Sequence, residues 1–417
     1  MSHRVALSAL LLALCAQGCD ALRSLASPEV PLWVNHPGNA IFVFGRRELT
    51  AQSRRVGEAY ERGKPEIDHH HRRVFVGSSD HGLYALSAVD LDTLWRFETG
   101  GAVQSEPLYD PRDDSVYFGS NDGALYKLRA VDGKMLWRFG SNAEITRQPV
   151  LHKGLLYAVN ANDTLLCIDP TNGKMRWYRH RTPAAGMEIS GYAGPAVYEE
   201  FVYSAFSDGV VMAYRTRDGA EAWPGPVDLA ADAEQSRAGE EVRYLDVDST
   251  PVIGKAGDTD ALFVASYEGG VYALDALSGE REWLNDAITG VTELTLWEAP
   301  AKPRPGRAGE RKNRVLVASS GLTGLWGLDP DTGAELWRRD LPVGGITGAE
   351  PWAGVLLVGT TRFGIFVVHP LDGGVIDGVH HGGAFAATPA AYGRSAYMLS
   401  NEGILYGLFI APPLDGA

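Results

Sequence analysis

Two aspartates separated by one residue, Asp246 and Asp248, are the strongest candidates for chemistry in this chain of 417 residues. In an extended segment the side chains at positions i and i+2 point to the same side, so the two carboxylates would form one paired acceptor for an arginine or lysine. The alternative is local, with each aspartate capping the turn that leads into the strand at Pro251. The sequence is consistent with both interpretations.

Residues that could support catalysis are few. The sequence has no serine, histidine and aspartate arrangement and no metal-ligand spacing, and most of the remaining acids belong to turns of a repeat. In the run His69-His70-His71 only the first and third side chains would share a face, and Arg72 and Arg73 follow directly. We therefore predict a protein that is not an enzyme and that uses no cofactor or metal.

The chain is built from a repeat that ends in tryptophan. Each copy reads as a strand, a turn rich in Asn, Asp and Gly, a second strand, a glycine turn and a third strand, because these turn residues tolerate left-handed backbone. The repeat tryptophans are Trp95, Trp137, Trp177, Trp223, Trp283 and Trp337. They lie 42, 40, 46, 60 and 54 residues apart. A seventh copy has Asp377 at the tryptophan position, and an eighth ends near Ile410.

A fourth strand in each unit is expected upstream of most hairpins. These short segments hold Pro107, Pro149, Pro195, Pro251, Pro351 and Pro389. Units of this size stack radially because none can bury both its faces alone. We predict an all-β protein, an eight-bladed β-propeller of four-stranded antiparallel blades. The last unit lacks its fourth strand, and residues 40–44 would supply it and close the ring.

The aromatic and cysteine positions fit this fold. The six repeat tryptophans are predicted to pack between blades, since a buried indole supplies a large apolar area at each junction. Trp297 lies outside the register and is a candidate exposed anchor. Cys167 alternates with Leu166 and Ile168 in a strand and is predicted to be a small core residue.

The N-terminal residues are predicted to be a targeting segment. Residues 5–15 are apolar but too short to span a bilayer, and Ala16-Gln17-Gly18-Cys19 resembles the bacterial lipoprotein processing box. Cys19 would then carry the lipid that anchors the protein to a membrane. We expect a signal peptide over residues 1–19, a tether over 20–37 and the propeller over 38–417. Plain secretion or a retained anchor is the alternative.

The charge of the chain excludes one class of partner. The formal net charge is −14 and the pI is about 5.3, so the surface repels the phosphate backbone of nucleic acids. Two insertions interrupt the repeat, an acidic one at 224–244 and a basic, proline-rich one at 284–313. The basic insertion is predicted to be a solvent-exposed loop, and a contact for an acidic partner is the alternative.

The repeat resembles that of pyrroloquinoline-quinone (PQQ) propellers, most clearly at residues 168–177, 274–283 and 328–337. Within that superfamily the chain resembles the BamB-type lipoproteins of outer-membrane β-barrel assembly. Residues 243–252 are similar to the family pattern R-x-x-D-V-D-T-T-P-V, and residues 187–196 are similar to L-x-L-R-G-x-x-A-P-A. Ser190 stands where that second pattern has arginine.

The resemblance implies a scaffold that docks on the periplasmic domains of a BamA-type barrel-inserting protein. Met187 and Ile189 would be its apolar contacts, and Asp246 and Asp248 its acidic contacts. Unfolded outer-membrane proteins are further expected partners, and the expected location is the cell envelope, on the outer membrane and facing the periplasm. The inner membrane stays an open alternative.

Two other functions are weighed against this scaffold. One is a generic periplasmic or cell-surface propeller that binds a small molecule, a polysaccharide or another protein. The other is a quinone-dependent dehydrogenase, which the sequence disfavours because such enzymes resemble much longer chains with an adjacent pair of cysteines, and this chain has no such pair.

Overall fold

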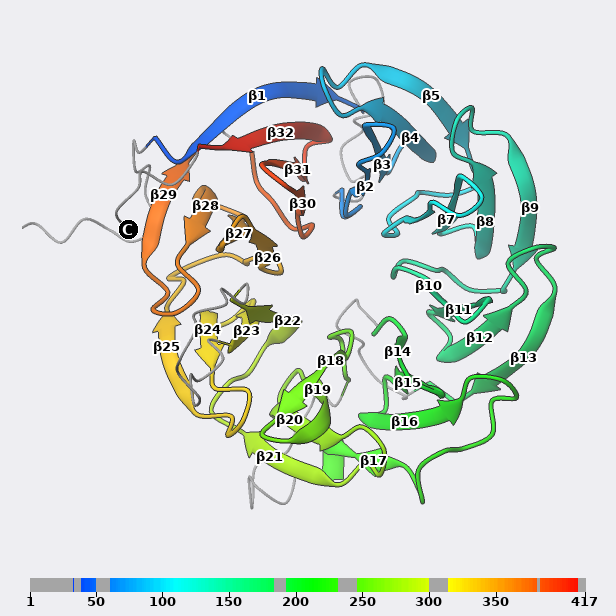
Figure 1. Cartoon of the computed structure of the whole chain (residues 1–417), viewed down its shortest axis with the longest axis vertical. Coiled ribbons are helices and arrows are strands. Elements are labelled where there is room, and N and C mark those ends of the chain that lie inside the picture. The colour runs from blue at the N-terminus through cyan, green and yellow to red at the C-terminus, as the bar shows by residue number, and fades with distance from the viewer. Residues whose placement is uncertain are drawn as a thin grey trace, which may run out of the picture. The chain divides into compact units, whose positions relative to one another are not determined.

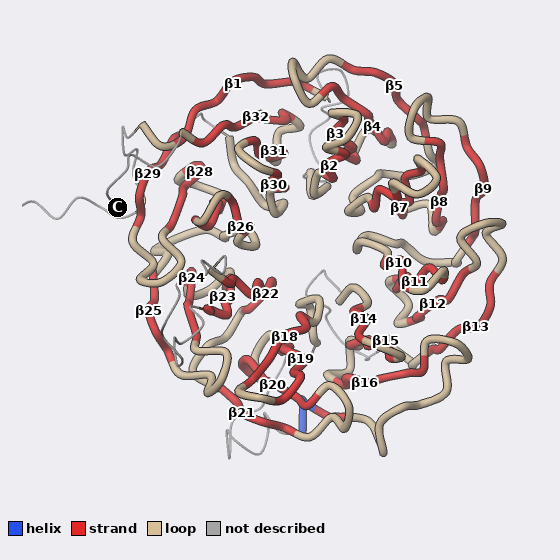
Figure 2. The backbone as a smooth tube through the Cα atoms, viewed as in Figure 1, coloured by secondary structure: helices blue, strands red, loops and turns tan. Residues whose placement is uncertain are grey.

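The computed structural model describes residues 33, 39–49, 61–183, 193–231, 246–299, 314–380 and 383–411. Asn35–Ala417 forms one compact unit, separate from Met1–Val34. Its strands form eight four-stranded antiparallel sheets, which are arranged as blades around a common centre (Figure 1). Almost all the remaining described residues are turns and loops (Figure 2). The predicted eight-bladed propeller is confirmed.

Each blade runs from an inner strand at the centre to an outer strand at the perimeter (Figure 1). Blade 1 contains β2 (Glu66–Asp68), β3 (Arg73–Gly77), β4 (Gly82–Ser87) and β5 (Thr93–Glu98), and blade 2 contains β6 (Leu108–Asp110), β7 (Ser115–Gly119), β8 (Ala124–Arg129) and β9 (Met135–Gly140). Blade 3 contains β10 (Val150–His152), β11 (Leu155–Asn160), β12 (Thr164–Ile168) and β13 (Met175–His180), and blade 4 contains β14 (Ala196–Tyr198), β15 (Phe201–Ala205), β16 (Val210–Arg215) and β17 (Val227–Asp228).

The second half of the ring follows the same order. Blade 5 contains β18 (Val252–Ala256), β19 (Thr259–Ser266), β20 (Gly270–Asp275) and β21 (Arg281–Asn285), and blade 6 contains β22 (Val291–Glu298), β23 (Arg314–Ser320), β24 (Gly324–Leu328) and β25 (Glu335–Arg339). Blade 7 contains β26 (Glu350–Trp352), β27 (Val355–Thr360), β28 (Gly364–Val368) and β29 (Val375–Val379), and blade 8 contains β30 (Ala390–Tyr392), β31 (Ser395–Leu399), β32 (Ile404–Ile410) and β1 (Ile41–Glu48).

The apolar core lies between blades. All five residues of β3 and all five of β7 are buried, because a neighbouring blade covers each face of these middle strands. Outer strands such as β5 alternate between exposed and half-buried residues, as expected for strands with one face in solvent.

One tryptophan and one glycine fix each of six blade junctions. The indole Nε1 of each repeat tryptophan donates to a carbonyl of the next blade at 2.8–3.1 Å, as from Trp95 to Ala130. The same indole covers a turn glycine of that blade, whose φ is 66–79°. A Cβ on such a glycine would lie 2.4–2.8 Å from the ring, so no larger residue fits without a shift. The predicted packing of the six tryptophans between blades is confirmed.

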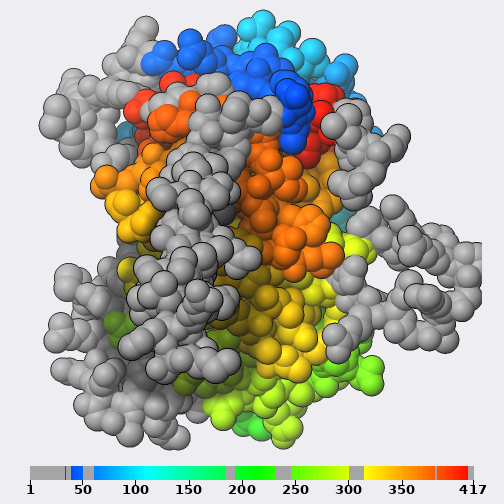
Figure 3. Space-filling view, turned by 90° about the vertical axis from the view of Figure 1, so that its left-hand side faces the viewer, coloured from blue at the N-terminus to red at the C-terminus, as the bar shows by residue number. Residues whose placement is uncertain are grey.

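The N-terminal strand closes the ring. β1 pairs with β32 in antiparallel register, so residues before the first blade complete the last one. In Figure 3 the blue atoms of β1 lie against the red and orange atoms of the last two blades. Contacts between β1 and β29 and between β2 and β30 join the first and last parts of the chain. The predicted closing strand is confirmed, and it extends to Glu48.

Three sequence predictions are corrected in detail. In blade 4, Trp223 precedes the outer strand rather than lying in it, because Pro224 and Pro226 cannot donate to a strand ladder and β17 forms only at Val227. The segment 284–313 is not one loop, since Val291–Glu298 is the inner strand of blade 6. Trp297 lies in that strand and is only 6% exposed, so it is not an exposed anchor.

The signal peptide, Cys19 and the tether lie outside the described residues, and their boundaries stay predictions. Over the part of the chain that is described, no helix has the length and apolar character needed to cross a membrane.

Candidate functional site

The described ends of the two predicted contact segments lie together. Met187 and Ile189 lie outside the described residues, but the chain just after them is placed. The N–H of Gly194 donates to Oγ1 of Thr250 at 2.9 Å, and Ala193 shares an apolar cluster with Val247. Ala193 and Gly194 therefore contact the segment that carries Asp246 and Asp248.

Several hydrogen bonds hold the aspartate segment. The carbonyl of Asp246 accepts from the N–H of Tyr267 at 3.1 Å. Ser249 Oγ accepts from the N–H of Ala265 at 3.0 Å, and the Arg147 guanidinium donates to the carbonyl of Asp248 at 2.7 Å. These contacts fix the backbone of residues 246–249 against blades 3 and 5.

The two aspartates face each other, but they are buried. Asp246 is 5% exposed and Asp248 is 4% exposed. Burial, together with the negative charge of Asp246, raises the pKa of Asp248 to about 8, although the charge of Arg147 lowers it. At neutral pH the pair therefore shares a proton rather than carrying two full charges. Their role in partner binding stays a prediction, because a partner could reach these carboxyl groups only if the segment opened.

A second group of polar residues lines the centre of the ring. The first residues of the inner strands and those just before them enclose a cavity of about 210 Å³, to which all eight blades contribute. Its charged lining residues are Lys64, Glu106, Glu293 and Glu350. In most blades the lining residue immediately precedes a proline, as in Lys64-Pro65 and Glu106-Pro107. The sequence analysis missed this cavity, although the repeated residue before proline was a usable signal.

The lining of the central cavity has more carboxyl groups than cations. Arg147 pairs with Glu293 at 2.5 Å, and the Lys64 ammonium lies 3.8 Å from the Glu350 carboxylate. Burial raises the pKa of Glu66 to about 7, although the N–H of Tyr109 and the charge of Lys64 lower it. Burial also raises the pKa of Glu106. These acids are held where ionisation is unfavourable, so the centre attracts protons or cations rather than anions.

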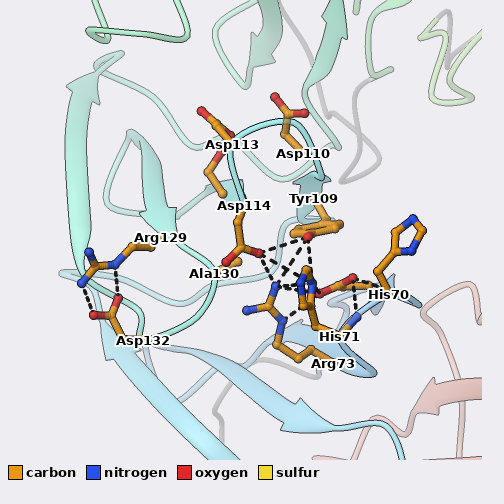
Figure 4. Close-up of polar contacts among 12 residues, drawn as sticks. His70, His71, Arg73, Tyr109, Asp110, Asp113, Asp114, Arg129, Ala130 and Asp132 are labelled. Carbon is orange, nitrogen blue, oxygen red and sulfur yellow. Dashed lines mark hydrogen bonds and ion pairs between the residues drawn. The ribbon is translucent and has the colours of Figure 1, made fainter.

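One cluster of possible metal ligands bears on the prediction that no metal is bound. Asp68, His71 and Asp114 place a ligand atom each within 4.8 Å of one another. Figure 4 shows Arg73 close to His71, Asp114 and Tyr109. Its guanidinium pairs with Asp68 at 2.7 Å and also with Asp114. The cationic side chain already pairs with both carboxylates, so these residues suit an ion-pair network that joins blades 1 and 2 better than a metal centre.

Cys167 has the environment expected of a core residue. It is fully buried in the apolar cluster formed by β11, β12, β13, β15 and β16. Burial raises the pKa of its thiol to about 12, so the thiolate required of a nucleophile is not populated at neutral pH.

The repeats, the glycine–tryptophan junctions and the strand order together define a PQQ-like eight-bladed β-propeller. Comparison with known proteins leads to a narrower group. The family model described as "Outer membrane protein assembly factor BamB" matches residues 111–298, from blade 2 to the inner strand of blade 6. The resemblance to BamB-type proteins predicted from the sequence is thereby confirmed.

Individual relatives agree with the family model. The BamB protein of Legionella pneumophila is 25% identical over 233 residues, which is 56% of this chain and 54% of that protein. The chain thus aligns with about half the length of this relative. The crystal structure of BamB from Moraxella catarrhalis has a TM-score of 0.68 at 17% identity and covers 88% of this chain and 99% of that one.

The propeller itself is also found in enzymes. A quinohemoprotein alcohol dehydrogenase from Pseudomonas putida HK5 has a TM-score of 0.65 at 11% identity, covering 90% of this chain and 78% of the enzyme. At this identity the likeness concerns the fold alone, and it carries no argument for catalysis.

Proposed function

We propose that this chain is a non-enzymatic scaffold in the assembly of outer-membrane β-barrel proteins, and that it docks on the periplasmic domains of a BamA-type barrel-inserting protein. The proposal includes a lipid on Cys19 that holds the propeller at the periplasmic side of the outer membrane. Its role is mechanical, because a rigid ring can hold flexible partner domains in one orientation.

The observation that carries the docking proposal is the hydrogen bond between Gly194 and Thr250. It joins the ends of two segments that resemble the contact loops of BamB-type proteins. Met187 and Ile189 would supply apolar contacts from the first segment. Asp246 and Asp248 would stabilise the second segment from its buried side. They would contact a cationic group of the partner directly only after the segment opens.

Sequence similarity supports the wider assignment. The curated relatives that match are named as outer-membrane protein assembly factors, and the matched family model carries the same description. A small-molecule or polysaccharide propeller has less support, since the central cavity of about 210 Å³ is small and acidic.

The test is to recover the native, tagged protein from gently solubilised membranes and to identify its companions by mass spectrometry. We expect a BamA-type barrel protein with the wild type. In the double variant Met187→Ala and Ile189→Ala its recovery should fall about tenfold, since each lost apolar contact costs about 1 kcal/mol or more. The double variant Asp246→Asn and Asp248→Asn keeps the shapes of the two side chains. A change in the recovery of the barrel protein would therefore be due to the loss of the carboxyl groups.

The matched control is Asp90→Asn and Asp92→Asn, an exposed pair with the same spacing at the perimeter of blade 1. This control should leave recovery unchanged. If the wild type brings down no barrel-assembly protein, the proposed function is wrong. If it does so but neither site variant lowers recovery, the function survives and the docking face is wrong.

A further inference from the structure

The aspartate segment, residues 246–249, is closed over two carboxyl groups. The side chains of Asp246 and Asp248 hydrogen-bond to each other, although they are only 5% and 4% exposed. A hydrogen bond between two carboxyl groups requires a proton, because an ionised carboxylate can only accept. The closed segment therefore holds one proton between the two side chains.

The surroundings of Asp248 do not accommodate a second negative charge. Its Oδ1 is buried and has no hydrogen-bond partner among the residues that the structure describes. A buried carboxylate is stable only when hydrogen bonds or an opposite charge offset its loss of water. Arg147 donates to the backbone carbonyl of Asp248 at 2.7 Å, but its guanidinium also pairs with Glu293 at 2.5 Å. Loss of the shared proton would therefore leave two negative charges that Arg147 offsets only in part.

The charged groups that face Asp248 come from its own segment and from two blades. Asp246 lies on the same segment, Arg147 precedes β10 of blade 3, and Glu293 lies in β22 of blade 6. Behind them Glu106, which precedes β6 of blade 2, interacts with both Arg147 and Glu293. Burial and the charge of Asp246 raise the pKa of Asp248 to about 8, although Arg147 lowers it. The proton is therefore lost only when the pH passes neutrality.

Ser249 is the pivot of the aspartate segment. Its hydroxyl accepts from the N–H of Ala265 at 3.0 Å and donates to the carbonyl of the same residue at 3.2 Å. Thr250 is also held, because its Oγ1 accepts from the N–H of Gly194 at 2.9 Å. These contacts with blades 4 and 5 involve no charged side chain, so they are insensitive to the proton. Residues 246–248 can leave their site while the chain from Ser249 onward stays in place.

We propose that the aspartate segment is a latch controlled by a proton: the shared proton keeps residues 246–248 closed, and its loss to water opens them and exposes both aspartates as carboxylates. Val247, which is 1% exposed inside an apolar cluster, stabilises the closed position while the proton is present. Opening converts a buried acid pair into a paired acceptor for an arginine or lysine. The inference rests on the proposed docking function only for the identity of the partner.

The direction of the pH effect follows from the two pKa values of Asp248. In the open segment this carboxyl group is in water, where its ordinary pKa is 3.8, whereas in the closed segment its pKa is about 8. Below the first value pH does not change the opening equilibrium. Between the two values opening increases about tenfold for each pH unit, and above the second value it is constant. The segment is thus closed in acid and opens as the pH rises to neutral and weakly alkaline values.

The test is hydrogen exchange of the whole chain, followed by mass spectrometry of the peptide that contains residues 246–250. The measured quantity is the protection factor, the ratio of the exchange rate of the unfolded chain to the observed rate, so the direct effect of pH on exchange cancels. We expect the factor of this segment to fall about hundredfold between pH 5.5 and pH 7.5. It should lie well below that of β7 on blade 2 at every pH, because the latch opens without unfolding the ring.

Two variants assign the effect to Asp248. Asp248→Asn keeps a hydrogen bond to Asp246, since its amide N–H donates, and it has no proton to lose, so its protection factor should be independent of pH over this range. Glu293→Gln leaves Arg147 to Asp248 alone, so the fall should be smaller and should end at a lower pH. The exposed Asp286→Asn is the control and should behave as the wild type. Circular dichroism checks that each variant is folded.

Three results would overturn the proposal. A protection factor that does not change with pH would show that Asp248 ionises in place, with Arg147 turning to it from Glu293. A segment as strongly protected as β7 at every pH would show that it opens only when the ring unfolds. A pH dependence that survives Asp248→Asn would assign the effect to another acid, such as Glu66. None of these results depends on recovery of a barrel-assembly protein, so the latch and the proposed function can fail separately.

Discussion

Buried carboxyl groups near the ring centre set the pH response of the molecule. An acid whose pKa is raised by folding keeps its proton in the folded state at a pH where the unfolded chain has lost it. Below the ordinary pKa of the acid both states are protonated and there is no cost. As the pH rises toward the folded pKa the free energy of unfolding falls, and above that value the loss is constant.

Asp248 is the best residue on which to test this effect. Its pKa is raised from an ordinary value of 3.8 to about 8, and the groups that face it are Asp246, Arg147 and Glu293. We expect wild-type stability to fall by about 1–3 kcal/mol between pH 5.5 and pH 8 because of this residue. Asp248→Asn should flatten that dependence in urea unfolding measured across the same range.

The exposed Asp286→Asn is the control, and it should preserve the wild-type slope. Glu66, with a pKa raised to about 7, remains in both variants and leaves a smaller fall over the same pH range. A slope unchanged by Asp248→Asn would show that this carboxyl group is solvated and ionised in the folded state.

At the scale of the element, the glycine turn before the outer strand of blades 2 to 7 connects the repeat pattern to the packing of blades. Its glycine needs a positive φ, and the indole of the preceding blade also lies on it. The two requirements can be separated by comparing two glycines. Gly154 has a similar φ of 79°, and a Cβ there would have no atom within 4 Å, whereas a Cβ at Gly133 would lie 2.7 Å from Trp95.

Replacing each glycine by alanine should give different costs. Gly154→Ala should lower the free energy of unfolding by about 1–2 kcal/mol, the cost of left-handed backbone in a residue with Cβ. Gly133→Ala should lower the free energy of unfolding by that amount and by about 1–3 kcal/mol more, because the added methyl group overpacks against Trp95. Chemical denaturation measures both changes.

The same pair can be measured in a Trp95→Leu background. If the indole causes the additional loss, the two glycine variants should then cost nearly the same, as a double-mutant cycle requires. Equal costs already in the wild-type background would mean that Trp95 moves aside without strain.

The elements that the sequence predicted well are those with two independent signals. Outer strands combine a glycine turn with tryptophan, and most inner strands follow a proline. β22 has no proline and adjoins a basic segment, so its pattern was interpreted as part of a loop. The burial of Asp246, Asp248 and Trp297 could not be predicted, because it depends on which neighbouring blades close over them rather than on local residue order.

At the scale of the whole molecule, stability depends on closing the ring between residues more than 300 apart in the sequence. Six junctions join blades through an indole N–H that meets a carbonyl in a turn of the next blade. The junction between blades 7 and 8 is different because the outer strand of blade 8 is β1, which comes from the N-terminus. The backbone N–H groups at the start of this strand are hydrogen-bond donors, so this junction needs an acceptor rather than an indole N–H.

Asp377 provides that acceptor at the position where the repeat has tryptophan. Its Oδ2 accepts from the N–H groups of Ala40 and Ile41, each at 3.0 Å, and Oδ1 accepts from Gly378 at 2.8 Å. The side chain is 1% exposed. The sequence located this exception to the repeat, but its purpose became clear only when the partner strand was placed.

Restoring the repeat residue should therefore weaken the protein. Asp377→Trp places an indole donor beside N–H donors and removes the acceptor of the Ala40 and Ile41 N–H groups, which costs about 1–3 kcal/mol for a buried N–H such as that of Ile41. We expect a lower midpoint of unfolding and faster hydrogen exchange in Ile41–Glu48, with β9 on blade 2 unchanged. Ile376→Trp is the matched control, since this neighbouring side chain is 44% exposed and leaves the acceptor in place. If Asp377→Trp is as stable as the wild type and β1 stays protected, the ring is closed by the β1–β32 ladder alone, and the aspartate is a tolerated exception rather than the reason the N-terminal strand stays in place.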